Sequence, residues 1–92
     1  MSSMQEQKIL ETAIKVFGKE AQEDIAIEEM SELNQAILHN RRGIESNIPE
    51  EIADVLIAVE QLIMIHNCRD EVNSIKYHKL MRLQEKLFDK CM

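Results

Sequence analysis

The feature that most constrains the fold of this chain is its shortage of residues that break helices. Only Gly18, Gly43 and Pro49 are of this kind, in a chain of 92 residues. The remainder is rich in Leu, Ile, Met, Glu, Lys and Gln, which favour helix. No stretch has the alternation of a half-buried strand. The sequence therefore predicts one all-α domain over residues 1–92.

Apolar residues recur at helical spacing in four segments, separated by breaks near Gly18, across 39–48 and around 67–70. Asn47, with Glu50 three residues later, is a candidate cap for the third segment, and Asp70 is a candidate cap for the fourth. Short connections between helices favour an antiparallel four-helix bundle. We expect helices over Met4–Phe17, over Ala21–Leu38, from Asn47 to about His66, and beyond Asp70.

Charge and cysteine content exclude several functional classes. Seventeen acidic residues against eleven basic ones give a net charge of −6, which disfavours binding to nucleic acid. The most apolar run, Val55 to Ile65, is too short to cross a bilayer. Cys68 and Cys91 form no CxxC motif, and the first residues do not resemble a secretory leader, which favours reduced thiols. We expect a cytoplasmic protein without a nucleic-acid or membrane partner.

The second predicted helix contains three glutamates in the stretch AIEEMSELNQAI, residues 26–37. At about 100° per residue, Glu29 and Glu32 share a stripe directly beside the main apolar stripe, whereas Glu28 points away from it. Two of the three glutamates are therefore expected to face inward.

The third predicted helix repeats this arrangement, because Glu51 and Asp54 are three residues apart and align with apolar positions. Its segment IADVLIAV is apolar nearly all round, as in a buried helix. Ionised carboxylates in such a place require a cation, which is Lys, Arg or a divalent ion. Ligation by oxygen alone favours Mg²⁺, or Mn²⁺, over zinc. The alternative is a solvated acidic face with ordinary helix-start charges.

The two acidic motifs are EExxE at Glu28–Glu32 and ExxD at Glu51–Asp54. They lie in the settings IEEMSELNQAI and PEEIADVLIAV, and a further helix with IKYHKLMRLQEKL follows. In these features, over about residues 25–87, the chain resembles the MazG-like branch of the all-α nucleoside triphosphate pyrophosphatase superfamily.

The resemblance implies hydrolysis of a nucleoside or deoxynucleoside triphosphate between its α and β phosphates, with Mg²⁺ as cofactor. The products would be the monophosphate and pyrophosphate, in a house-cleaning role. By position, Glu29, Glu32, Glu51 and Asp54 would be the metal ligands, and Glu29 or Glu32 would take the proton of the attacking water. Glu28 would lie behind the ligands and support them.

The resemblance also implies phosphate-binding residues on the fourth helix. Lys79 and Arg82 match the basic residues of the family there, and Lys76 is an additional candidate on the same apolar stripe. The alternative is that these long side chains keep their charged ends in water. Relatives form dimers or tetramers, so a homodimer or homotetramer is expected. The competing functions are a non-catalytic helical interaction protein and a nucleotide sensor that does not cleave.

Overall fold

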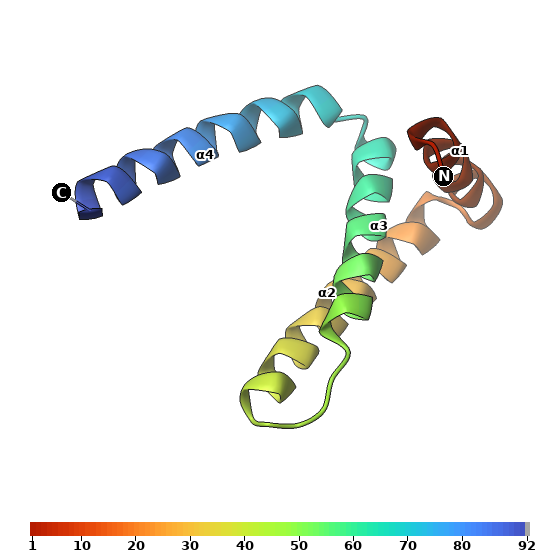
Figure 1. The fold of residues 1–92 in the computed structure, drawn as a ribbon. Coiled ribbons are helices and arrows are strands. Elements are labelled where there is room, and N and C mark those ends of the chain that lie inside the picture. The colour runs from red at the N-terminus through yellow and green to blue at the C-terminus, as the bar shows by residue number, and fades with distance from the viewer. Residues whose placement is uncertain (92) are drawn as a thin grey trace.

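A computed structural model, which describes residues 1–91, shows that the chain forms four helices. The helices are α1 (Ser3–Phe17), α2 (Lys19–Arg41), α3 (Ile48–His66) and α4 (Arg69–Cys91) (Figure 1). No strand occurs within the described residues. The prediction of an all-α chain with four helices is therefore confirmed.

The ends of the helices follow from local backbone chemistry. Gly18 has a φ of +94° and separates α1 from α2 at the predicted break. Asn47 accepts a hydrogen bond from the Glu50 backbone N–H through Oδ1 at 3.3 Å, and its Nδ2 donates to Glu50 Oε2 at 2.9 Å. The predicted cap of α3 is thus confirmed. Asn67 adopts the left-handed conformation with a φ of +48° and ends α3.

The predicted cap of α4 is wrong by two residues, because the residue before the helix is Cys68. Asp70 was the expected cap, but α4 starts at Arg69, and the Val72 N–H donates to the Cys68 carbonyl at 2.9 Å. Asp70 therefore lies in the first turn, where negative charge is also favourable. Arg69 Nη2 donates to Glu60 Oε2 at 2.7 Å and ties the start of α4 to α3.

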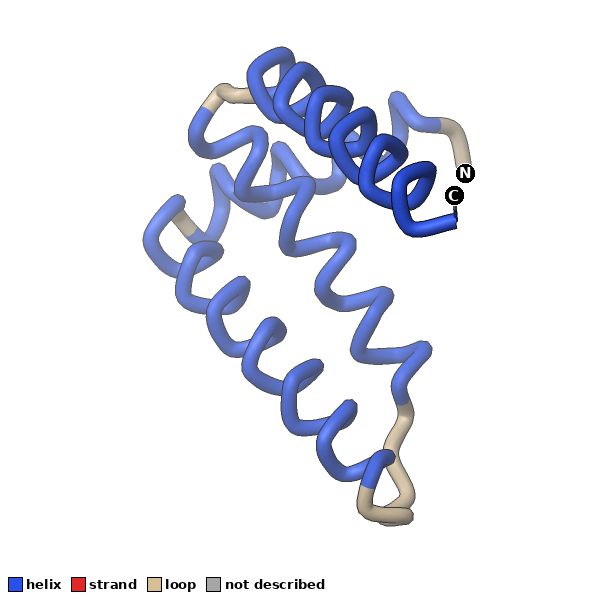
Figure 2. The backbone as a smooth tube through the Cα atoms, turned by 90° about the vertical axis from the view of Figure 1, so that its left-hand side faces the viewer, coloured by secondary structure: helices blue, strands red, loops and turns tan. Residues whose placement is uncertain are grey.

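The helices pack unequally. α2 and α3 form an antiparallel pair joined by the loop around Gly43, and α1 lies across one end of this pair in contact with both helices (Figures 1 and 2). α4 contacts only α3, and it projects from the end of α3 (Figure 1). Within residues 1–91 the four helices therefore do not close into the predicted bundle. None of the described helices is long and apolar enough to cross a membrane.

The core between the packed helices is small and consists mainly of alanine. The buried apolar residues are Leu10, Ala26, Ala36 and Ala58. Small side chains allow α2 and α3 to approach closely. Gln22 and Gln61 are also buried, and Gln61 Nε2 donates to Gln22 Oε1 at 2.7 Å. This hydrogen bond satisfies one polar atom of each amide in a position that would otherwise be costly.

Candidate metal centre

The α2–α3 pair brings together acidic side chains from both predicted motifs. Glu29 comes from α2, and Glu51 and Asp54 come from the first two turns of α3. One carboxylate oxygen from each of the three residues lies within 4.8 Å of the others. We call Glu29, Glu51 and Asp54 the acidic trio. All three residues are half-buried, so the sequence-based expectation of inward-leaning carboxylates holds for this trio.

Two oxygens of the acidic trio lack a hydrogen-bond partner. Glu29 Oε2 and Glu51 Oε2 are shielded from solvent, and no protein donor reaches them. A shielded carboxylate oxygen without a donor is unfavourable, because burial removes water without replacing its hydrogen bonds. These two oxygens therefore have unused capacity to accept a donor or a cation.

The electrostatic environment disfavours ionisation of the same two residues. Desolvation raises the pKa of Glu29, and the charges of Asp54 and Glu32 raise it further. Desolvation also raises the pKa of Glu51, followed by the charges of Glu32 and Asp54. The acidic trio and Glu32 thus repel one another when all are ionised.

The two remaining glutamates of the EExxE motif are exposed. Glu32 lies close enough to act on the pKa of both Glu29 and Glu51, but it is outside the trio whose ligand atoms converge. Glu28 is exposed and forms no side-chain hydrogen bond or ion pair within the described residues. Of the three glutamates of the motif, Glu29 therefore belongs to the acidic trio, Glu32 lies at its edge and Glu28 lies outside it.

Glu50 is a further acidic residue near the acidic trio, and the motif pattern does not include it. Its charge contributes to the raised pKa of Glu51. Asn47 holds the Glu50 carboxylate through a hydrogen bond at 2.9 Å, at the start of α3. The capping box that predicted the start of α3 therefore also indicated that Glu50 lies near the acidic trio and Glu32.

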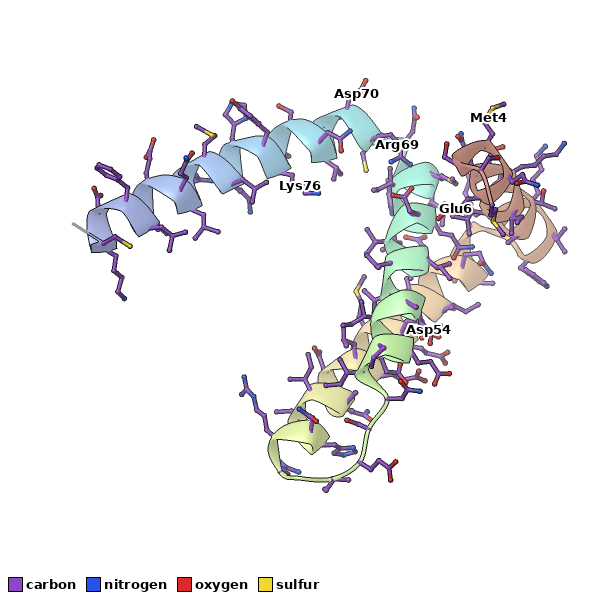
Figure 3. All side chains as sticks on the ribbon, in the orientation of Figure 1. Met4, Glu6, Asp54, Arg69, Asp70 and Lys76 are labelled. Atoms are coloured by element: carbon purple, nitrogen blue, oxygen red, sulfur yellow. The ribbon has the colours of Figure 1, made fainter. Side chains whose placement is uncertain are left out.

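The basic residues predicted to bind phosphate do not lie beside the acidic trio. Lys76, Lys79 and Arg82 are exposed on α4, which has no contact with α2. Figure 3 shows Lys76 beneath α4, well apart from Asp54 on the opposite side of α3. Within residues 1–91, Arg69 pairs with Glu60 and His66 is hydrogen-bonded to Glu23, so no basic side chain of the described residues pairs with the trio.

Comparisons of the chain with protein-family models, with curated proteins and with solved structures find no match.

Proposed function

We propose that the protein is a Mg²⁺-dependent nucleoside triphosphate pyrophosphohydrolase of the MazG-like type. It would cleave a nucleoside or deoxynucleoside triphosphate into the monophosphate and pyrophosphate. The observation that carries the proposal is the convergence of Glu29, Glu51 and Asp54, which come from two motifs on two helices. Convergence of this kind is what the motif resemblance requires.

The chemistry of the acidic trio suits a hard divalent cation. All donors are carboxylate oxygens, which Mg²⁺ and Mn²⁺ prefer. Glu29 Oε2 and Glu51 Oε2 are shielded and unpaired, so a cation would supply the missing interaction. Glu32, at the edge of the trio, would complete a set of four ligands with Glu29, Glu51 and Asp54.

The proposed roles of the side chains follow from their positions. Glu29, Glu32, Glu51 and Asp54 would hold Mg²⁺, which would neutralise the charge of the polyphosphate and orient it. Glu29 or Glu32 accepts the proton of the attacking water. The resemblance gives Glu28 a supporting role, but Glu28 is exposed and contacts none of the proposed ligands through a hydrogen bond.

Binding of the substrate also requires positive charge for its phosphates. Lys79 and Arg82, with Lys76, are the proposed phosphate-binding residues. These residues lie on a helix that does not contact α2, so within one chain they are not beside the acidic trio. The proposal therefore includes a homodimer or homotetramer in which α4 packs against another copy.

The test of the activity is incubation of the purified protein and Mg²⁺ with a panel of nucleoside triphosphates that includes modified bases. Chromatography should identify monophosphate and pyrophosphate as the products of at least one member. Diphosphate with inorganic phosphate would indicate cleavage at the wrong bond. No turnover of any member would reject the enzymatic proposal.

A second test addresses the metal directly. Asp54→Asn and Glu32→Gln should each weaken Mg²⁺ binding by at least about tenfold. Removing a group that only supports a metal ligand already costs about tenfold or more, so removing a ligand should cost at least as much. Glu20→Gln is the matched control, since it removes one charge from an exposed position of the same helix. Calorimetric titration with Mg²⁺ measures the affinities. Equal binding by all three variants would contradict the proposed ligands.

The competing proposal is a non-catalytic helical interaction protein, and the exposed apolar side chains of α3 and α4 favour it. In that case Asp54→Asn and Glu32→Gln change neither Mg²⁺ affinity nor the free energy of unfolding. A nucleotide sensor is distinguished by tight nucleotide binding without any product.

A further inference from the structure

The hydrogen bond between Gln22 and Gln61 lies on the line of contact between α2 and α3, which we call the seam. The acidic trio lies on the same seam. Seven residues separate Gln22 from Glu29 along α2, and seven residues separate Gln61 from Asp54 along α3. Seven residues are about two helical turns. Because α2 and α3 run antiparallel (Figure 2), the amide pair and the two carboxylates face each other in one common register.

The apolar contacts on the seam specify this register only weakly. The buried apolar residues of α2 and α3 are Ala26, Ala36 and Ala58. An alanine presents a single methyl group, so it does not interlock with the facing helix as a large side chain does. The segment IADVLIAV of α3 is also apolar nearly all round. If α3 slid by one turn, α2 would therefore meet a similar apolar surface.

The amide pair supplies the directional contact that the alanines lack. Gln22 and Gln61 are each 5% exposed, and Gln61 Nε2 lies 2.7 Å from Gln22 Oε1. A slip of one turn moves one amide about 5.4 Å along the seam and breaks this hydrogen bond. Two buried amides without their partner are costly. A buried polar residue fixes the register of coiled coils in the same way, at some cost in stability.

The acidic trio depends on this register because its members come from two helices. Glu29 lies on α2, Glu51 and Asp54 lie on α3, and one oxygen of each lies within 4.8 Å of the others. A slip of about 5.4 Å exceeds that separation and would move Glu29 away from Asp54. Repulsion among the carboxylates favours such a slip when no cation is bound. The hydrogen bond between Gln22 and Gln61 opposes it.

We propose that Gln22 and Gln61 are positioning residues for the acidic trio. Their hydrogen bond fixes the register of α2 on α3 and so holds the trio together before a cation binds. The benefit for Mg²⁺ binding rests on the proposed function, whereas the fixed register does not. Leucines at both positions should therefore keep the fold and lose the register, because apolar side chains pack without a directional contact.

The first measurement is the register itself. Spin labels on Glu20→Cys of α2 and Ile52→Cys of α3, two exposed positions, report how far the helices are displaced along the seam. Pulsed electron resonance should give one narrow distance when both glutamines are present. Gln22→Leu with Gln61→Leu should broaden the distribution or shift it by about 5 Å, the rise of one turn.

The labels require a background in which Cys68→Ser and Cys91→Ser remove the native free thiols. Labelled chains are diluted into an excess of unlabelled chains, so that distances between copies do not contribute. Leu10→Val is the matched control, since it alters the buried residue of α1 and leaves the seam unchanged. It should keep the narrow distance.

The second measurement is the Mg²⁺ affinity by calorimetric titration. Gln22→Leu with Gln61→Leu should bind Mg²⁺ at least about tenfold more weakly, the loss expected when a group that orients a metal ligand is removed. Its urea midpoint should stay close to that of the wild type. A contact with a purely structural role would not lower the affinity at unchanged stability. Gln22→Met with Gln61→Met keeps the length of both side chains and should give the same results, and Leu10→Val should keep the wild-type affinity.

The outcomes separate this proposal from the proposed function. An unchanged distance in both double variants would overturn the proposal, and so would an equal change in Leu10→Val. A changed register with wild-type Mg²⁺ affinity would also overturn it, since the acidic trio would then not depend on the amide pair. If the wild type bound no Mg²⁺ while the double variants lost the register, the metal centre would be rejected and the role of the amide pair would stand.

Discussion

α2 and α4 are both helices of 23 residues, yet they relate to the rest of the chain in opposite ways. α2 packs against α1 and α3, buries Gln22, Ala26 and Ala36, and holds part of the acidic trio. α4 buries no residue and contacts only α3 at its start. An amphipathic pattern therefore predicts that one face of a helix is covered, but it does not identify what covers that face.

The α2–α3 pair and α4 also differ in the sign of the charge that they carry. The α2–α3 pair gathers negative charge at the acidic trio, where Glu29 Oε2 and Glu51 Oε2 lack partners. α4 gathers positive charge beside an apolar groove that includes Lys76 and Lys79. The two regions therefore differ in what they leave unpaired: two shielded carboxylate oxygens in the acidic trio and an exposed apolar groove on α4.

The largest expected effect comes from overfilling the contact around α2. Ala26 is 1% exposed, so Ala26→Leu forces side chains or helices apart and should destabilise the protein by about 2–3 kcal/mol. The same type of change on α4, Ser74→Leu, enters solvent and should alter the free energy of unfolding by less than about 0.5 kcal/mol. Urea denaturation measures both values. Equal effects would show that the two helices do not differ as described.

The four helices and the inward placement of Glu29, Glu51 and Asp54 depend on local geometry, so the sequence could predict them. Glu32 was also expected to face inward, but it is exposed. A spacing of three residues places Glu51 and Asp54 on one side of α3 regardless of the remaining fold, and Asn47 caps α3 through a contact three residues away. The projection of α4 was not predicted, because its direction depends on the elbow around Asn67 and on long-range packing. The burial of Gln22 and Gln61 was also missed, since glutamine is ordinarily exposed.

That missed pair gives the next prediction in size. Gln61→Leu leaves the Gln22 amide buried without its donor and should cost about 1–3 kcal/mol. The double variant Gln22→Leu with Gln61→Leu removes both polar groups and should recover most of the loss. A thermodynamic double-mutant cycle in urea gives the coupling between the two residues. Additive losses would mean that the hydrogen bond does not hold α2 and α3 in register.

The smallest expected effect concerns pH, and it separates the acidic trio from the rest of the chain. The pKa values of Glu29 and Glu51 are raised above 4.5, so these carboxyls bind protons more tightly in the folded than in the unfolded chain. Lowering the pH from neutrality towards 4.5 should therefore stabilise the metal-free protein, and raising the pH through the raised pKa values should remove this contribution. The effect is modest because both side chains are only half-buried and solvent screens their charges.

The measurement is the urea midpoint of the metal-free protein at several pH values in this range. Replacing both residues, as Glu29→Gln with Glu51→Gln, should flatten the pH dependence, because neither amide titrates. Contributions from groups distant from the acidic trio are common to both proteins and cancel in the difference between the two curves. The difference therefore reports the trio together with the coupled Glu32. The exposed control Glu20→Gln should keep the wild-type slope. If the double variant also kept the wild-type slope, repulsion within the acidic trio would not contribute to the stability of the folded chain. The electrostatic reason for placing a cation there would then be lost.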